Sequence, residues 1–553
     1  MKEIFKNILS ILDRGEKQKL LTLSLLDVFI SILDILFLIA LLYVISFYSN
    51  PEYSIIIPGI PFSIFNDYPL LLITFFFLLF GIKNGLGFVI FKMQYNFVYK
   101  VASRISKDNL FQYLNGTYQD HVNIDSSVIN RKISQQPIEF SHYVLNGMQQ
   151  LFSQAVLILI SIIAILLFDP ILFILLVLIL AIPVLFIAYF MKRKMHEARI
   201  YGKKTSEKAI QHLQEALAGF VESNVYLKND FFTSRYHTFQ SQLNRYLSER
   251  LIIQSLPPRM IEVFAVFGLF LLILINHFTS GNVSIQLVTI GAFMAAAYKI
   301  IPGTVKIINA MGQVMTYAYS AKGLLNPVPK PIRKNNNKDH IESITLNNVC
   351  FSYPEKTVLN SFSLRIAKGD LLGISGNSGK GKTTVANLLL GFLDQDSGNI
   401  YFNDLITDIE CRQNYRNKIA YIKQQPFFIH ASIIQNITLQ EAGYDIEKLE
   451  NVISITGLDK IVSTLPVGLE TIVTENGKNF SGGQRQRIIL ARALYKDFDM
   501  LILDEPFNEL DEASEIQMMT HLQQIAKEGK IVLLITHNKT ALSFCNKIIS
   551  LDE

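Results

Sequence analysis

Six long apolar runs occupy the first 308 residues of this 553-residue chain and constrain its fold more than any other feature. The runs cover residues 20–48, 69–91, 150–168, 171–191, 260–278 and 287–308. Each is close to the roughly 20 residues that a membrane-spanning helix requires. The sequence therefore predicts an α-helical transmembrane domain with six spanning helices over residues 1–325.

The first twelve residues alternate apolar side chains with Lys2, Glu3, Lys6 and Asn7. This pattern makes one apolar stripe on a helix that is too short to cross a bilayer. It predicts an interfacial helix that lies on the membrane and contacts its lipids.

Basic residues are distributed unevenly between the links. The links at 49–68, 169–170 and 279–286 contain no Lys or Arg, whereas the N-terminus and the two long links contain many. Because cytoplasmic links carry the excess of basic residues, both termini are predicted to be cytoplasmic. We expect a multi-pass protein of the cell (inner) membrane.

The two long links have about 60 polar residues each and have helical patterns. Folded as helical hairpins, their arms of about 30 residues extend roughly 45 Å at 1.5 Å per residue. The turns are predicted near 120–130 and 217–227. Short helices at these turns are expected to dock on a cytosolic domain.

The composition changes after residue 325. Residues 326–340 are rich in Pro, Asn and Lys and are interpreted as a linker, and residues 341–553 are typical of a soluble α/β domain. The net charge of +5 is too small to indicate nucleic-acid binding without a clustered basic face. All three cysteines lie in this half, and a reduced cytosolic setting is expected for it.

The first functional motif of this domain is a phosphate-binding P-loop. The pattern G-x-x-x-x-G-K-T follows the apolar run 371–374 and precedes a predicted helix from residue 385, which is the context the motif needs. Backbone N–H groups and the helix N-terminus would bind phosphate, Lys382 would add charge, and Thr383 would bind Mg²⁺. The predicted ATP-binding residues here are Gly376, Asn377, Ser378, Gly379, Lys380, Gly381, Lys382, Thr383 and Thr384.

A second segment, residues 500–505, is an apolar strand that ends in two carboxylates, Asp504 and Glu505. A strand in this position delivers Asp504 to the Mg²⁺ ion. Glu505, one residue later, is predicted to polarise the attacking water as the general base.

The stretch Phe480-Ser481-Gly482-Gly483-Gln484 resembles the L-S-G-G-Q signature of ATP-binding cassette (ABC) ATPases, with Phe in place of Leu. The resemblance continues through residues 485–487 and 491–494. Signature, P-loop and carboxylate strand occur in the order of that family. The sequence thus predicts a P-loop NTPase domain that uses ATP and Mg²⁺.

The resemblance implies roles for further residues. It assigns Tyr353 to stacking on adenine, Gln424 to sensing Mg²⁺ and the membrane domain, and His537 to the γ-phosphate. It places Asp511 at the contact between two ATPase domains. This chain departs from the family at Lys423 and at residues 507–509, which affects the expected geometry of that contact loop.

In the family, Ser481 and Gly483 of the signature act on nucleotide held by a partner's P-loop, and Gly482 and Gln484 are counted with them among the predicted ATP-binding residues. One chain with one ATPase domain therefore cannot complete a site. The implied partner is a second copy of the chain, forming a homodimer, or a related half-transporter.

Six spanning helices fused ahead of one ATPase domain resemble the ABC exporter half-transporters. Residues 256–262 and 295–302 resemble lipid-linked oligosaccharide flippases of the PglK type, as do Lys83-Asn84 and Leu33-Asp34. The resemblance implies outward movement of an amphipathic, lipid-linked oligosaccharide. Export of peptides, bacteriocins or drugs stays open as the alternative, as does a regulator that gates a partner, although Glu505 and His537 argue against it.

Charged residues inside the predicted spans extend this interpretation. Asp34 and Lys83 are both about 20 Å deep at 1.5 Å per residue, so they are expected to pair or to face a wet cavity. Lys83 and Lys299 could hold a diphosphate head group. Because Asp27, Asp34 and Glu262 also lie in the spans, the lysines could instead only neutralise carboxylates.

Overall fold

The computed structural model describes residues 2–49, 69–116, 118–168, 186, 189, 204–278, 287–324, 340–354, 356–377 and 379–552. It divides into two compact units, which are described separately. One contains Met1–Leu114 and Ile124–Val328, and the other contains Asn115–Asn123 and Pro329–Glu553. The second unit thus includes a short segment, residues 115–123, that the sequence-based boundaries placed in the transmembrane domain.

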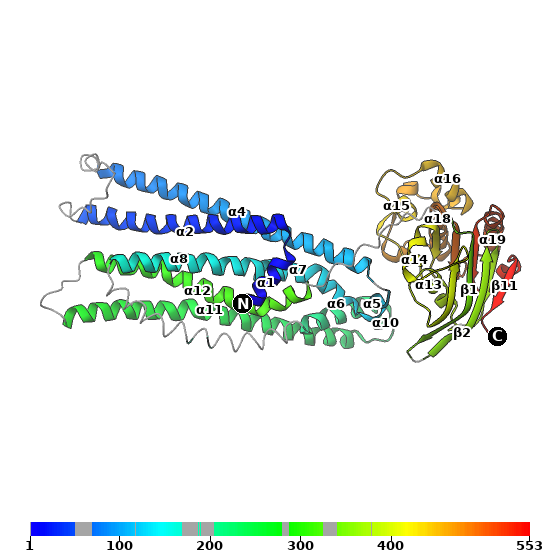
Figure 1. Cartoon of the computed structure of the whole chain (residues 1–553), viewed down its shortest axis with the longest axis horizontal. Coiled ribbons are helices and arrows are strands. Elements are labelled where there is room, and N and C mark those ends of the chain that lie inside the picture. Colours follow the sequence, from blue (N-terminus) through cyan, green and yellow to red (C-terminus); the bar gives the residue numbers. More distant parts are fainter. Residues whose placement is uncertain are drawn as a thin grey trace. The chain divides into compact units, whose positions relative to one another are not determined.

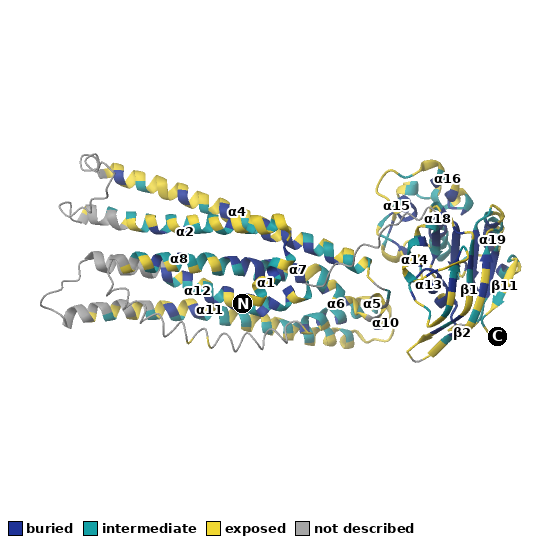
Figure 2. Ribbon diagram, viewed as in Figure 1, coloured by how far each residue is buried: buried dark blue, intermediate teal, exposed yellow. Residues whose placement is uncertain are grey.

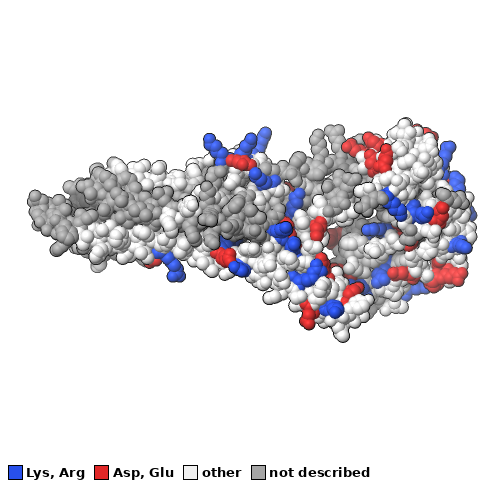
Figure 3. Space-filling model, turned by 90° about the horizontal axis from the view of Figure 1, so that it is seen from below, with Lys and Arg blue, Asp and Glu red and all other residues white. Residues whose placement is uncertain are grey.

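Long helices make up most of the first unit (Figure 1). Their bounds are α1 Lys2–Ile11, α2 Arg14–Ser49, α4 Pro69–Leu114, α8 Asn146–Phe168, α11 Asn229–Phe278 and α12 Leu287–Gly323. Helix α8 packs against α12 and α2, and α2 also packs against α4. On the face shown in Figure 3, charged side chains are absent from the described surface at the extreme left end of this unit.

Three of the described helical stretches are long and apolar enough to cross a membrane: Arg14–Leu41, Leu70–Leu114 and Ser126–Ala164. They overlap the first three predicted spans, 20–48, 69–91 and 150–168. The fourth predicted span, 171–191, lies outside the described residues except at 186 and 189. The links at 50–68, 169–170 and 279–286 and linker residues 326–339 lie outside them as well. The fifth and sixth lie within α11 and α12, which are helical over those residues.

Short helices occur at both predicted cytoplasmic turns, which confirms that part of the sequence analysis. They are α5 Tyr118–Asn123 and α6 Ser126–Asn130 at the first turn and α10 Phe220–Val225 at the second. Between α6 and α8 the chain continues through two π-helical turns, η2 Arg131–Gln135 and η3 Phe140–Leu145, which flank α7 Gln136–Glu139. The second predicted hairpin is helical over residues 204–218 and in α11.

The first helix packs against the bundle through its apolar stripe. Ile8 and Leu12 are buried in a cluster that includes Leu23 of α2, Phe97 of α4 and Phe140 of η3. The amphipathic helix predicted at the N-terminus is therefore present, and its apolar residues cover the start of α2 and the adjacent part of α8.

Two main sheets form the second unit. The parallel sheet has the strand order β11-β3-β10-β9-β6, and the antiparallel sheet has the order β2-β1-β4-β5. The strands of the parallel sheet are β3 Leu371–Ser375, β6 Ile419–Ile422, β9 Met500–Asp504, β10 Ile531–Ile535 and β11 Lys547–Ser550. Those of the antiparallel sheet are β1 Ser343–Tyr353, β2 Lys356–Ala367, β4 Ser397–Phe402 and β5 Leu405–Ile406. A third, two-stranded sheet pairs β7 Ala431–Ser432 with β8 Ile472–Val473.

Central strands β9 and β10 are buried along their whole length, because apolar clusters cover both faces of the parallel sheet (Figure 2). A run of apolar residues without alternation is what such a doubly covered strand requires. The principal helices of the unit are α13 Lys382–Leu389, α15 Ile433–Thr438, α16 Ile446–Ile455, α18 Gly482–Tyr495 and α19 Glu512–Lys527. The smaller ones are α14 Ile409–Asn414, α17 Asp459–Val462 and α20 Lys539–Ser543.

Parallel register determines where the loops of this sheet meet. Ile535 of β10 pairs with Ile374 of β3 on one side and with Asp504 of β9 on the other. The loops after these three strands therefore begin at one edge of the sheet. In open α/β sheets this carboxyl edge is where ligands bind.

The packing of the α/β unit can be tested at Phe402, which is fully buried and stacks on Tyr415 with ring centroids 5.0 Å apart. Phe402→Ala should lower the free energy of unfolding by about 3–5 kcal/mol, the usual cost of a cavity of that size. Pulse proteolysis of the purified chain in urea measures this change. Leu405→Ala, at a side chain 68% exposed, is the control and should leave the unfolding midpoint almost unchanged.

Candidate nucleotide-binding site

The glycine loop after β3 takes the backbone form that the P-loop pattern predicts. Gly376, Gly379 and Gly381 have φ values of 149°, 80° and 101°. At Gly381 an added Cβ would lie 2.6 Å from Val358, so both backbone conformation and space require glycine there. Helix α13 begins at the next residue, and its first N–H groups are therefore directed to the loop.

Lys382 is held inside this loop. Its side chain is 9% exposed, and its Nζ donates a hydrogen bond to the Gly376 carbonyl at 2.5 Å. The same Nζ lies 3.9 Å from Oε1 of Glu505. A cation is thus placed between the loop that would hold the phosphates and the predicted general base.

Thr383 and Asp504 meet, as expected for metal ligands. Thr383 Oγ1 donates a hydrogen bond to Asp504 Oδ2 at 2.8 Å. Burial raises the pKa of the Asp504 carboxyl, partly offset by this hydrogen bond. Two hard oxygen donors at one point, one of them a desolvated carboxyl, suit Mg²⁺, which prefers oxygen ligands and favours the ionised form.

Glu505 has a strained backbone conformation, with φ of 50°. Its N–H donates to the Ile535 carbonyl at 2.8 Å, which fixes the turn. Such a conformation at a non-glycine residue costs of order 1–3 kcal/mol and occurs preferentially at functional sites. The strain directs the Glu505 carboxylate toward the edge of the sheet.

Two amide side chains orient the Glu505 carboxylate. Its Oε2 accepts hydrogen bonds from Gln424 Nε2 at 2.7 Å and from Asn508 Nδ2 at 3.0 Å. On the other oxygen, His537 Nδ1 lies 3.6 Å from Oε1. The predicted catalytic residues Glu505, His537 and Gln424 therefore come together, although they come from three different loops.

Tyr353, the predicted adenine contact, is the last residue of β1. Its ring is partly exposed and packs edge-on against Phe351 with centroids 5.0 Å apart. An exposed aromatic face at a strand end can accept a base by stacking, so adenine contact stays a prediction for this residue.

The signature segment forms the start of α18. Ser481 caps the helix with a reciprocal bond to Gln484, and Phe480 is buried in the core in place of the family's leucine. Among the described residues, no hydrogen bond or ion pair of Ser481–Arg485 reaches the P-loop, and Arg485 pairs with Glu509 at 3.1 Å. The hydrogen bonds between Ser481 and Gln484 are thus local to the start of α18, and a role of the signature in ATP binding stays a prediction.

Asp511 is the N-cap of α19, where its carboxylate accepts hydrogen bonds from Ser514 N at 3.1 Å and Ser514 Oγ at 2.6 Å. These bonds hold the pKa of Asp511 below its usual range. This local role explains why an aspartate occurs here, and its expected position at a domain contact stays a prediction.

Three contacts near the site were not predicted from the sequence. Asn508 holds Glu505, Lys356 Nζ donates to the Gly379 carbonyl at 3.3 Å, and the Asp552 carboxylate accepts from Asn377 N at 2.9 Å. The last contact follows from the register of β11 on β3, in which Ser550 is opposite Ser375. Of these three contacts, only that of Asn508 could have been predicted from the sequence, because Asn508 is three residues after Glu505.

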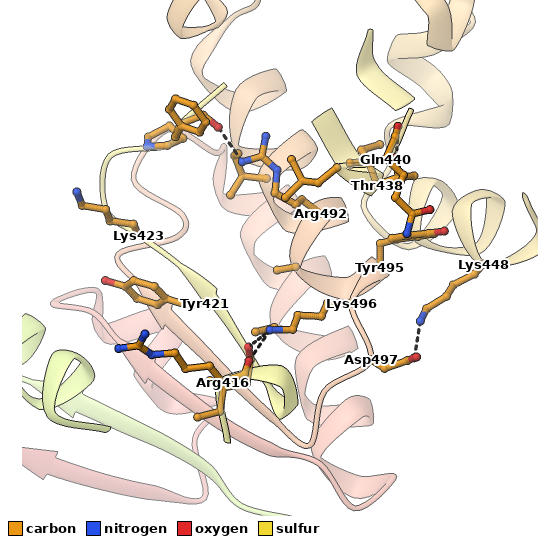
Figure 4. Close-up of a pocket in the computed structure, with 18 of the residues that line it drawn as sticks. Arg416, Tyr421, Lys423, Thr438, Gln440, Lys448, Arg492, Tyr495, Lys496 and Asp497 are labelled. Carbon is orange, nitrogen blue, oxygen red and sulfur yellow. Dashed lines mark hydrogen bonds and ion pairs between the residues drawn. The ribbon is translucent and has the colours of Figure 1, made fainter. Parts of the chain in front are cut away.

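A groove of about 800 Å³ lies beside the same sheet, between β6 and α18 (Figure 4). Basic side chains dominate its polar lining: Arg416, Lys423, Lys448, Arg492 and Lys496. The ring of Tyr118 in α5 lies 5.2 Å from that of Phe392, which lines the groove, and the Arg416 guanidinium lies 4.3 Å from the Phe392 ring. The first turn helix therefore docks on the ATPase domain, as predicted.

The intramembrane charges were partly predicted correctly. Lys83 Nζ forms an ion pair with Asp34 Oδ1, which confirms the expected proximity. Asp27 accepts hydrogen bonds from Gln94 and, at 3.3 Å, from Gln149. Glu262 is exposed on α11, and the side chain of Lys299 lies outside the described residues.

Comparisons with known proteins agree with this geometry. Residues 359–508 match the family described as "ABC transporter". Curated relatives include a probable ABC transporter ATP-binding/permease protein of Haemophilus influenzae, 32% identical over 38% of this chain and 38% of the relative. Another is the glutathione/L-cysteine transport system protein CydD of Bacillus subtilis, 32% identical over 48% of this chain and 47% of the relative.

An ATP-dependent lipid A-core flippase of Cupriavidus pinatubonensis is 28% identical over 62% of this chain and 59% of the relative. The chain thus matches less than two thirds of the length of each of these curated relatives. A solved structure of a bacterial Atm1-family ABC exporter with ATP bound aligns with this chain at a TM-score of 0.80 and 15% identity. The alignment covers 98% of this chain and 94% of the exporter chain. This likeness confirms the predicted fold class.

The assignment of Glu505 can be tested by Glu505→Gln, which removes the base and keeps the shape of the side chain. Turnover of ATP by the purified chain should fall by 10²–10⁴-fold, the usual cost of losing a general base, while ATP binding persists. The control is Glu512→Gln, an exposed carboxylate in the first turn of α19. Near-normal hydrolysis by Glu505→Gln would refute the assignment.

Proposed function

We propose that this chain, which carries the ATP-binding domain of ABC transporters and the fold of an ABC exporter, is an ATP-driven exporter of an anionic amphipathic substrate. The observation that carries the proposal is the grouping of Glu505 with Gln424, Asn508 and His537 at the sheet edge where Thr383 and Asp504 meet. A chain that only regulates a partner has no need of a general base held in place by Gln424 and Asn508.

In the proposed reaction, the loop glycines and Lys382 bind the phosphates of ATP. Thr383, Asp504 and Gln424 would hold Mg²⁺, which would supply positive charge against the phosphates. Glu505 takes a proton from the attacking water while Gln424 and Asn508 hold its carboxylate. His537, whose Nδ1 lies 3.6 Å from Glu505 Oε1, would contact the γ-phosphate.

Coupling to the membrane helices is proposed to act through α5. Tyr118 packs on Phe392, and Phe392 packs on Arg416, which lies just before β6. Gln424 follows the end of β6 by two residues and bonds to Glu505. A displacement of α5 can therefore reach the general base through one strand.

The proposed partner is a second copy of the chain. The signature residues do not contact the P-loop of their own chain among the described residues, so another copy must supply them. Exposed apolar residues on the second turn helix also indicate an unfilled contact: Phe220, Val221 and Val225 are each more than 60% exposed. Glu262, exposed on a spanning helix, likewise needs protein or a wet cavity against it.

Dimer formation can be tested by disulfide trapping. With Cys350, Cys411 and Cys545 replaced by serine, Asn377→Cys and Ser481→Cys in one chain should form an intermolecular disulfide in the presence of ATP, Mg²⁺ and a mild oxidant. The Glu505→Gln background should increase the yield because the closed state persists. Non-reducing electrophoresis measures the product.

The matched control pairs Asn377→Cys with Leu405→Cys, which is exposed but far from the signature in sequence. It should give no ATP-dependent product. Equal trapping by both pairs, or none from the signature pair in ATP, would count against the proposed arrangement.

For the substrate, we infer a lipid-linked amphipath, with an oligosaccharide head as the first candidate. The curated relative quoted above with the widest coverage is a lipid A-core flippase, and this chain places polar groups from α2, α4 and α8 within its spanning region. Lys83 is paired with Asp34, so an anionic head would have to compete with or bridge that pair. The likeness to CydD favours small thiol peptides as the second candidate.

The substrate proposal is tested by ATPase stimulation in nanodiscs. Polyprenyl-diphosphate sugars should raise turnover, whereas neutral drugs, cationic peptides and glutathione should not. Lys83→Ala combined with Lys299→Ala should abolish the stimulation and leave basal turnover intact. The lipid-linked substrate would be rejected if only peptides or glutathione stimulated turnover and the lysine substitutions did not change that stimulation. Peptides or glutathione would then be the substrate class.

A further inference from the structure

An apolar groove of about 550 Å³ lies between α1, α2 and α8 in the first unit. This volume is within the 300–1,000 Å³ typical of ligand pockets. Its walls are mainly the apolar side chains of Phe5, Leu9, Leu20, Leu21, Met148 and Phe152. The groove therefore suits a hydrocarbon chain rather than a nucleotide or an ion.

A lysine without an acidic partner lies on the lining of this groove. Lys17, near the start of α2, is exposed, and the neighbouring carboxylates Asp13 and Glu16 both pair with Arg104, at 3.4 and 2.7 Å. Among the described residues no carboxylate forms an ion pair with Lys17. The charge of Lys17 is therefore available for an external anion.

The opposite end of the groove contains a buried acceptor without a donor. Gln149 is 5% exposed and lines the groove, and its Nε2 donates to Asp27 Oδ2 at 3.3 Å. That bond determines which end of the amide faces Asp27, and Gln149 Oε1 has no hydrogen-bond partner among the described residues. Since buried polar groups are nearly always satisfied, the donor to Gln149 Oε1 must be a water molecule at this inner end of the groove.

We propose that this groove binds one anionic glycerophospholipid of the cytoplasmic leaflet, with its acyl chain between α1, α2 and α8 and its phosphate on Lys17. Gln149 lies beside Asp27, ten residues beyond Lys17 on α2, or about 15 Å along a helix. Lys17 and Gln149 are thus separated along the axis of α2, which is also the direction expected for the acyl chain of a membrane lipid. The α1 helix is then held to the bundle by lipid as well as by Ile8 and Leu12.

The probe is phosphatidylglycerol, with phosphatidylcholine as the neutral comparison. Binding to the purified full chain in detergent is titrated by native mass spectrometry without ATP, so the result does not depend on transport. Lys17→Ala should weaken the tightest phosphatidylglycerol binding about fivefold, the effect of one lysine beside an anionic lipid. Lys19→Ala, two residues later on α2 and not on the groove, should leave it unchanged.

A second variant separates the groove from general surface charge. Ser24→Phe fills the groove and keeps every charge, so it should weaken binding of both lipids. Equal losses from Lys17→Ala and Lys19→Ala would show diffuse electrostatic attraction instead. Full lipid binding by Ser24→Phe, or no tight binding by the wild type because a second copy covers the groove, would also overturn the proposal.

Discussion

Parallel pairing of β3, β10 and β9 is the constraint on which the nucleotide site depends. The register puts Ile374, Ile535 and Asp504 at the same level of the sheet. The P-loop, the His537 loop and the Glu505 turn therefore start side by side, although the P-loop is more than a hundred residues from the other two in sequence. Apolar clusters on both faces of the sheet hold these strands in register. The packing of the core therefore fixes the distances between the catalytic groups in the loops.

The strained turn at Glu505 shows how the packing of the core determines the position of the predicted general base. The Ile535 carbonyl holds the Glu505 N–H, and the chain must then turn through a left-handed conformation. Gln424 and Asn508 both donate hydrogen bonds to the resulting carboxylate, and Gln424 ends the proposed path from α5 through β6. A conformational signal can thus act on the orientation of the base without changing its identity.

Motifs that are contiguous in sequence were predicted well, because each one encodes a local structure. The P-loop, the 500–505 strand and the signature each consist of a few neighbouring residues with a known backbone form. The Asp34–Lys83 pair was also found, because a helix has a fixed rise per residue and depth in the bilayer can be counted. In contrast, the Lys356–Gly379 and Asp552–Asn377 contacts depend on strand pairing across the sheet, and the positive φ of Glu505 depends on a hydrogen bond from β10.

The Asp34–Lys83 pair has a consequence for energetics across the bilayer. An isolated charge that moves through a membrane potential changes its free energy by about 2.3 kcal/mol per 100 mV. Paired on α2 and α4, the carboxylate and the ammonium carry no net charge when these helices move together. The Asp34–Lys83 pair itself therefore adds no electrical work to a movement of these two helices.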